Sequence, residues 1–96
     1  MTPQDRKQKG NIVVIDDESA NLDSLAAILT EEGYTVCQAN DGQSGLQLVK
    51  RGLPDMVLVD VSLPGMNGYQ VCASLKNDPA TRNIPLILIV PNPPLD

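Results

Sequence analysis

Three aspartates that directly follow two apolar runs are the residues of this chain best placed to do chemistry. Asp16 and Asp17 come after the run 11–15, and Asp60 comes after the run 56–59. Each run is too short for a helix and rich in β-branched residues, which indicates a strand buried on both faces of a parallel sheet. Because ligands collect at the carboxyl ends of such strands, neighbouring runs would bring three carboxylates to one edge of the sheet.

Such a cluster of carboxylates needs positive charge, since acids a few ångströms apart resist ionising together. A hard divalent cation with oxygen ligands meets that need, and Mg2+ suits an open site that keeps several waters. Asp16 and Asp17 alone would be read as acids that complement the N-terminal dipole of a following helix. With Asp60 in register, we instead predict a Mg2+ site.

Composition indicates one small globular domain of 96 residues, 42% of them hydrophobic. A net charge of -5 without histidine argues against a nucleic-acid surface and leaves no imidazole for catalysis. No apolar stretch is long enough to span a membrane. Cys37 and Cys72 lack the spacing of metal ligands, so we expect both to be small, buried hydrophobic residues. We also expect a cytoplasmic protein with reduced thiols.

Helical and strand patterns alternate along the chain between two polar ends. We predict strands over 11–15, 34–39, 55–60 and 84–90 and helices over 19–32, 42–51 and 67–77, with Asp41 capping the second helix and Gly52 as its C′ residue. Strands separated by helices of this length predict βαβ crossovers and a parallel sheet. Residues 1–10 are expected to form a flexible arm, 11–90 the domain, and 91–96 a proline-rich tail.

Three segments together resemble the receiver domain of two-component response regulators: 12–18, 58–69 and 75–87. The match runs through 11–90 in order and in spacing. It implies a flavodoxin-like three-layer α/β sandwich whose parallel sheet has four strands in the order 2-1-3-4, with one helix on one face and two on the other. That order makes the two acid-bearing strands neighbours, as the carboxylate argument requires.

The resemblance also implies roles for the acids. Asp60 matches the aspartate that accepts a phosphoryl group, and an aspartate can attack phosphorus to form an acyl phosphate. Asp17 and Asp60 match direct Mg2+ ligands, the backbone carbonyl of Ser62 a third, and Asp16 an acid that acts through water. The implied function is phosphorelay signalling, with a sensor histidine kinase or phosphotransfer protein as donor and no enzyme activity of its own.

Two departures from the family pattern leave alternatives open. Val90 takes the place of the usual Thr or Ser, and nothing in the sequence matches the last strand, the last helices or the phosphate-binding lysine, so the resemblance is to a receiver truncated after its fourth strand. A degenerate receiver that acts as an interaction or dimerisation module is one alternative. A Mg2+-dependent phosphatase of the haloacid dehalogenase type is another, although its second acid is replaced by Ser62.

The run 84–90 is apolar on both faces, the pattern of a central strand, yet it would form the edge of the predicted sheet. An exposed hydrophobic edge promotes aggregation unless something covers it. We therefore expect a homodimer or larger assembly with residues 84–95 at the contact. Pairing across a two-fold axis would be antiparallel, with the seven residues before Pro91 setting the length of the ladder.

Overall fold

A computed structural model of the chain describes residues 9–90, and the predicted tail lies outside the described residues together with most of the predicted arm. Of that arm, Lys9 and Gly10 are described. Gly10 opens the first strand, one residue earlier than predicted, and the backbone N–H of Lys9 donates to the carbonyl of Gly33 at 3.1 Å. The first strand therefore begins before the apolar run, at Gly10.

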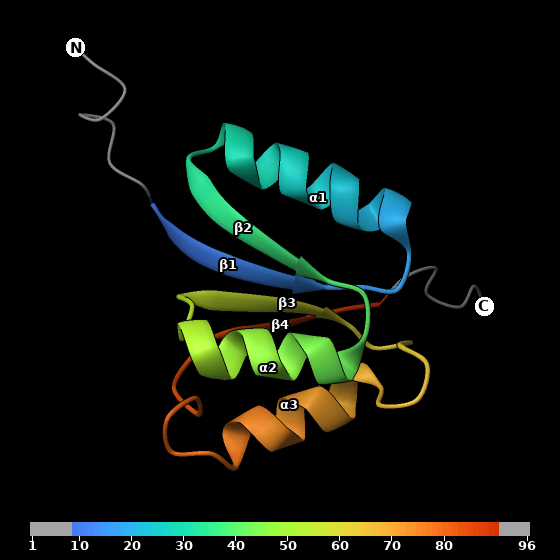
Figure 1. Cartoon of the computed structure of the whole chain (residues 1–96), viewed down its shortest axis with the longest axis vertical. Coiled ribbons are helices and arrows are strands. Elements are labelled where there is room, and N and C mark those ends of the chain that lie inside the picture. The colour runs from blue at the N-terminus through green and yellow to red at the C-terminus, as the bar shows by residue number, and fades with distance from the viewer. Residues whose placement is uncertain (1–8, 91–96) are drawn as a thin grey trace.

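Strands and helices alternate through the described residues (Figure 1). The strands are β1 (Gly10–Ile15), β2 (Tyr34–Ala39), β3 (Met56–Asp60) and β4 (Leu86–Ile89), and the helices are α1 (Ser19–Glu31), α2 (Gly42–Gly52) and α3 (Gly68–Lys76). All neighbouring strands pair in parallel, in the order β2-β1-β3-β4. The predicted fold and strand order are confirmed. None of the helices in this part of the chain is long and apolar enough to cross a membrane.

The sheet lies between two layers of helices, with α1 on one face and α2 and α3 on the other (Figure 1). Ile12 and Val14 of β1 pack against Leu22 of α1. Val13 and Ile15 point the other way, into the larger hydrophobic cluster beneath α2 and α3. Since both faces of β1 are buried, its sequence is a continuous apolar run rather than an alternating one.

The ends of α2 show one correct prediction and one error. Asp41 caps the helix as expected, because its side chain accepts the backbone N–H of Ser44 at 2.7 Å. Gly52, predicted to follow the helix, is its last residue, and Leu53 takes the left-handed conformation at φ 45°. The buried Pro54 explains the shift, because a residue before proline is disfavoured in the right-handed helical region.

The start of α3 is set by a capping box and a glycine. Asn67 accepts the backbone N–H of Gln70, and the Gln70 side chain accepts the backbone N–H of Asn67. The N–H of Gly68 donates to the carbonyl of Val61 at 3.3 Å. A Cβ at position 68 would overlap the carbonyl oxygen of Asp60, so only glycine lets the helix begin this close to the end of β3.

The fourth strand is shorter than predicted, with four residues in place of the seven over 84–90. Pro85 has no N–H to give to a ladder. Ile84 turns its N–H back to the carbonyl of Thr81 at 3.0 Å, so the chain leaves its turn only at Leu86. Any ladder across the outer edge of β4 therefore has four residues to use.

The expectation that both cysteines are buried is wrong for Cys37. This residue lies on the edge strand β2 beside a hollow of about 270 Å3, with Leu48 and Arg51 of α2 among its lining residues. Helix α2 does not cover this part of β2, which leaves the thiol of Cys37 exposed. Cys72 on α3 is half-buried, and both thiols are free.

Candidate functional site

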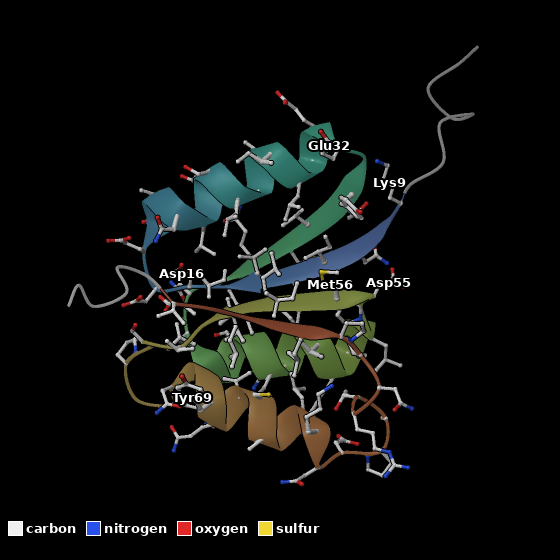
Figure 2. The ribbon with its side chains drawn as sticks, turned by 180° about the vertical axis from the view of Figure 1, so that it is seen from behind. Lys9, Asp16, Glu32, Asp55, Met56 and Tyr69 are labelled. Carbon is white, nitrogen blue, oxygen red and sulfur yellow. The ribbon has the colours of Figure 1, made fainter. Side chains whose placement is uncertain are left out.

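The three acids meet at the carboxyl ends of β1 and β3. In the parallel register Ile15 pairs with Val59, so Asp16 and Asp60 are the next residues along two neighbouring strands. One carboxylate oxygen from each of Asp16, Asp17 and Asp60 lies within 4.8 Å of the others. Figure 2 shows Asp16 at this end of the sheet. The convergence predicted from the sequence is confirmed.

The acids differ in burial, which gives the cluster a closed side and an open side. The exposed fraction is 2% for Asp16 and 4% for Asp60, whereas Asp17 is exposed to solvent. A cation could therefore reach the buried oxygens from the side of Asp17. An open side of this kind leaves room for retained waters, which Mg2+ usually keeps.

Both buried carboxylates are fixed by the loop that follows their own strand. Asp60 Oδ1 accepts the backbone N–H of Ser62 at 2.9 Å, and Asp16 Oδ1 accepts the backbone N–H of Glu18 at 3.0 Å. These are Asx turns, in which an aspartate bonds to the backbone two residues later. Ser62 thus contacts the cluster through its N–H, and the predicted role of its carbonyl oxygen stays a prediction.

The surroundings of Asp16 disfavour the charged form of its side chain. Burial raises the pKa of Asp16 above its ordinary value, the N–H of Glu18 opposes this effect, and the nearby carboxylate of Asp60 adds to it. The net direction is upward. Because the charge on buried Asp16 is disfavoured, added positive charge would stabilise this site.

Asn21 is a site residue that the sequence analysis missed. Its amide nitrogen donates to Asp16 Oδ2 at 3.4 Å and to Glu18 Oε1 at 2.7 Å. The signal available was its position, four residues after Asp17 in the first turn of the helix that begins directly behind the acids. The apolar spacing of that helix drew attention to the residues that face the core instead.

The donor set fits Mg2+ on the chemistry of its atoms. All three side chains offer carboxylate oxygens, the ligands that hard divalent cations prefer. Within residues 9–90 no lysine or arginine forms an ion pair with these acids: Lys9 pairs with Glu32, Lys50 with Asp78, and Lys76 bonds to backbone carbonyls. None of the described lysines and arginines therefore neutralises the cluster through an ion pair.

Residues 12–92 match the family described as the response regulator receiver domain. The chain belongs to this family. It is 51% identical over 78 residues to Response regulator PleD of Caulobacter vibrioides, covering 81% of this chain and 17% of PleD. It is 36% identical over 78 residues to Protein PilH of Pseudomonas aeruginosa, covering 81% of this chain and 64% of PilH. The receiver chain thus spans under two thirds of both relatives.

Solved receiver structures agree with this assignment. The N-terminal domain of a response regulator receiver protein from Methanoculleus marisnigri JR1 superposes with a TM-score of 0.86 at 31% identity, covering 92% of this chain and 72% of that one. The receiver domain of sensor histidine kinase PA1611 from Pseudomonas aeruginosa PAO1 superposes with a TM-score of 0.82 at 26% identity. The match covers 86% of this chain and 68% of that one. That structure has a magnesium ion coordinated in its active site cleft. Receivers are regulatory phosphoacceptor domains, so family membership favours phosphorelay over the interaction-module alternative.

Proposed function

We propose that this receiver accepts a phosphoryl group on Asp60 from a sensor histidine kinase or phosphotransfer protein. Asp16, Asp17, Asp60 and the carbonyl of Ser62 would hold the Mg2+ that the reaction needs. The observation that carries the proposal is the meeting of three carboxylates within 4.8 Å at two neighbouring strand ends. In a member of the receiver family, that meeting point supplies both a nucleophile and a cation site.

Asp60 has one carboxylate oxygen held by its loop and one left for nucleophilic attack. The N–H of Ser62 fixes Oδ1, which leaves the other oxygen for reaction. Its attack forms an oxygen–phosphorus bond while the bond between phosphorus and the donor imidazole nitrogen breaks and the electron pair returns to the imidazole. Bound Mg2+ would supply positive charge to the phosphoryl oxygens and to the acids.

Treatment with acetyl phosphate and Mg2+ followed by intact mass measurement tests the proposal. We expect the wild type to gain one phosphoryl group and Asp60→Asn to gain none. Asp23→Asn, which removes an exposed acid on α1, should behave as the wild type. An adduct on Asp60→Asn would show that another residue is the nucleophile. A folded wild type that gains nothing would count against phosphorelay.

We further propose that the outer edge of β4 is a contact between two copies of this chain. The strand pairs with β3 on one side, and no strand of residues 9–90 pairs with its other side. The exposed fraction is 48% for Ile87 and 52% for Val90. Burying ~400 Å2 of such apolar surface would contribute roughly 10 kcal/mol before association costs are subtracted.

Sedimentation at micromolar concentration tests this contact. We expect a dimer for the wild type and a monomer for Ile87→Lys, because a lysine on an edge strand opposes pairing between edges. Tyr69→Lys, at an exposed residue of α3, is the matched control and should leave the dimer intact. A wild type that sediments as a folded monomer would refute the contact.

The proposed location is the cytoplasm. Cys37 and Cys72 are both free, and free thiols fit a reducing compartment. Fractionation of cells that express the chain, with the protein followed by immunoblotting, checks the location. Recovery with an extracytoplasmic marker would contradict it.

A further inference from the structure

Asn21 links two acids at the rim of the proposed metal site. A single amide nitrogen lies 3.4 Å from Asp16 Oδ2 and 2.7 Å from Glu18 Oε1. The two carboxylates therefore lie within two hydrogen-bond lengths of each other, one buried and one exposed. Glu18 and Asp17 are both exposed, so Asn21 connects the buried Asp16 with the open side of the cluster.

The contact from Asn21 completes the constraint on Asp16. Oδ1 of this carboxylate is held by the N–H of Glu18 and Oδ2 by the amide of Asn21. Two bonds to different oxygens restrict rotation of the carboxylate group, so its orientation is set before any ligand arrives. Partners that orient a metal-site carboxylate in this way raise the affinity of the site.

Helix formation does not explain an asparagine at this position. Alanine forms helices better, by several tenths of a kcal/mol. Asn21 is not the N-cap either, since α1 has Glu18 in that role without a side-chain cap bond. A cation at position 21 would neutralise the acids, and another acid would add repulsion. Asparagine donates a hydrogen bond without changing the charge.

We propose that Asn21 is a positioning residue for the Mg2+ site: it orients Asp16 and keeps the carboxylate of Glu18 at the rim. The inference rests on the proposed function, because it concerns the same site. Asn21 acts through the two acids and needs no contact with the ion. Its removal is expected to weaken binding of a hydrated divalent cation while leaving the fold intact.

Calorimetric titration with Mg2+ and thermal unfolding of the metal-free protein test the role together. We expect Asn21→Ala to weaken Mg2+ binding roughly tenfold, the lower end of the effect of outer partners. The unfolding temperature of the metal-free variant should be unchanged or raised, because alanine favours the helix. Asn83→Ala, the same change at an exposed site between α3 and β4, should affect neither quantity.

A double-mutant cycle separates positioning from a general effect on structure. In a background that carries Asp16→Ala, the Asn21→Ala change should weaken Mg2+ binding much less than in the wild type, because the oriented carboxylate is already gone. Equal losses in both backgrounds would overturn the role, as would wild-type affinity in Asn21→Ala. Absence of Mg2+ binding by the folded wild type would instead refute the metal site itself, and the inference with it.

Discussion

Asp16→Asn tests the electrostatic account of the site most directly, because it removes one buried charge and keeps the shape of the side chain. The asparagine oxygen can still accept the N–H of Glu18 that now bonds to Asp16 Oδ1. Coulomb's law with an effective dielectric constant of about 20 gives about 3.5 kcal/mol for two unit charges separated by the 4.8 Å upper limit of the cluster. The open side of the site screens part of this repulsion.

We therefore expect metal-free Asp16→Asn to be more stable than the wild type at neutral pH, by about 1–2 kcal/mol. For a domain of this size that gain corresponds to about 5–15 °C in unfolding temperature. Urea unfolding followed by circular dichroism, with a chelator present, measures it. Added Mg2+ should stabilise the wild type more than the variant and so narrow the difference.

The pH dependence of this difference follows from the raised pKa of Asp16. In the folded protein its carboxyl holds a proton more tightly than the unfolded chain does, where the pKa is near 3.8. The contribution of Asp16 to stability is therefore fully present below pH 3.8 and is lost as the pH rises through the raised pKa. The free energy of unfolding of Asp16→Asn relative to the wild type should therefore increase between pH 3.8 and the raised pKa of Asp16. A variant no more stable than the wild type at neutral pH, or an equal advantage below pH 3.8, would refute the reasoning.

Two further substitutions follow from individual contacts, and a third from the comparison with the receiver pattern. Gly68→Ala should lower the free energy of unfolding by about 1–3 kcal/mol, because the new Cβ meets the carbonyl of Asp60; Gly52→Ala, with open space around its Cβ, is the control in the same urea assay. Thr81→Val removes a buried hydroxyl that donates to a carbonyl of α3 at 2.7 Å, and urea unfolding should show a loss of about 1–2 kcal/mol. Val90→Thr supplies the hydroxyl that receivers usually have and should raise the yield of acetyl phosphate adduct by intact mass; an unchanged yield would count against a role for that position.

The sequence predicts the sheet and the acid cluster well because both depend on short-range pattern and topology. Continuous apolar runs at 12–15 and 56–59 are typical of strands covered on both faces. Once those strands are parallel neighbours, the residues that follow them must meet at one edge. Asp16 and Asp60 are therefore placed without knowledge of any side-chain contact.

The features that the sequence analysis missed depend on contacts between elements. Whether Ile84 joins β4 is decided by its bond to the carbonyl of Thr81, which the apolar run does not reveal. The exposure of Cys37 depends on where α2 stops covering the edge of the sheet. The role of Asn21 depends on the angle at which α1 leaves the acids, and that angle is a property of the folded chain.

Helix α3 is held by contacts at both of its ends. It therefore connects the end of β3 that carries Asp60 with the segment that leads into β4. At one end Gly68 lies against the carbonyl of Asp60. At the other, Lys76 Nζ donates to the carbonyls of Arg82 at 2.9 Å and Ile84 at 3.0 Å, in the segment that leads to β4. A helix held at both ends tends to move together with the segments that it contacts. We therefore expect movement of the loop after Asp60 to shift the start of α3 as well.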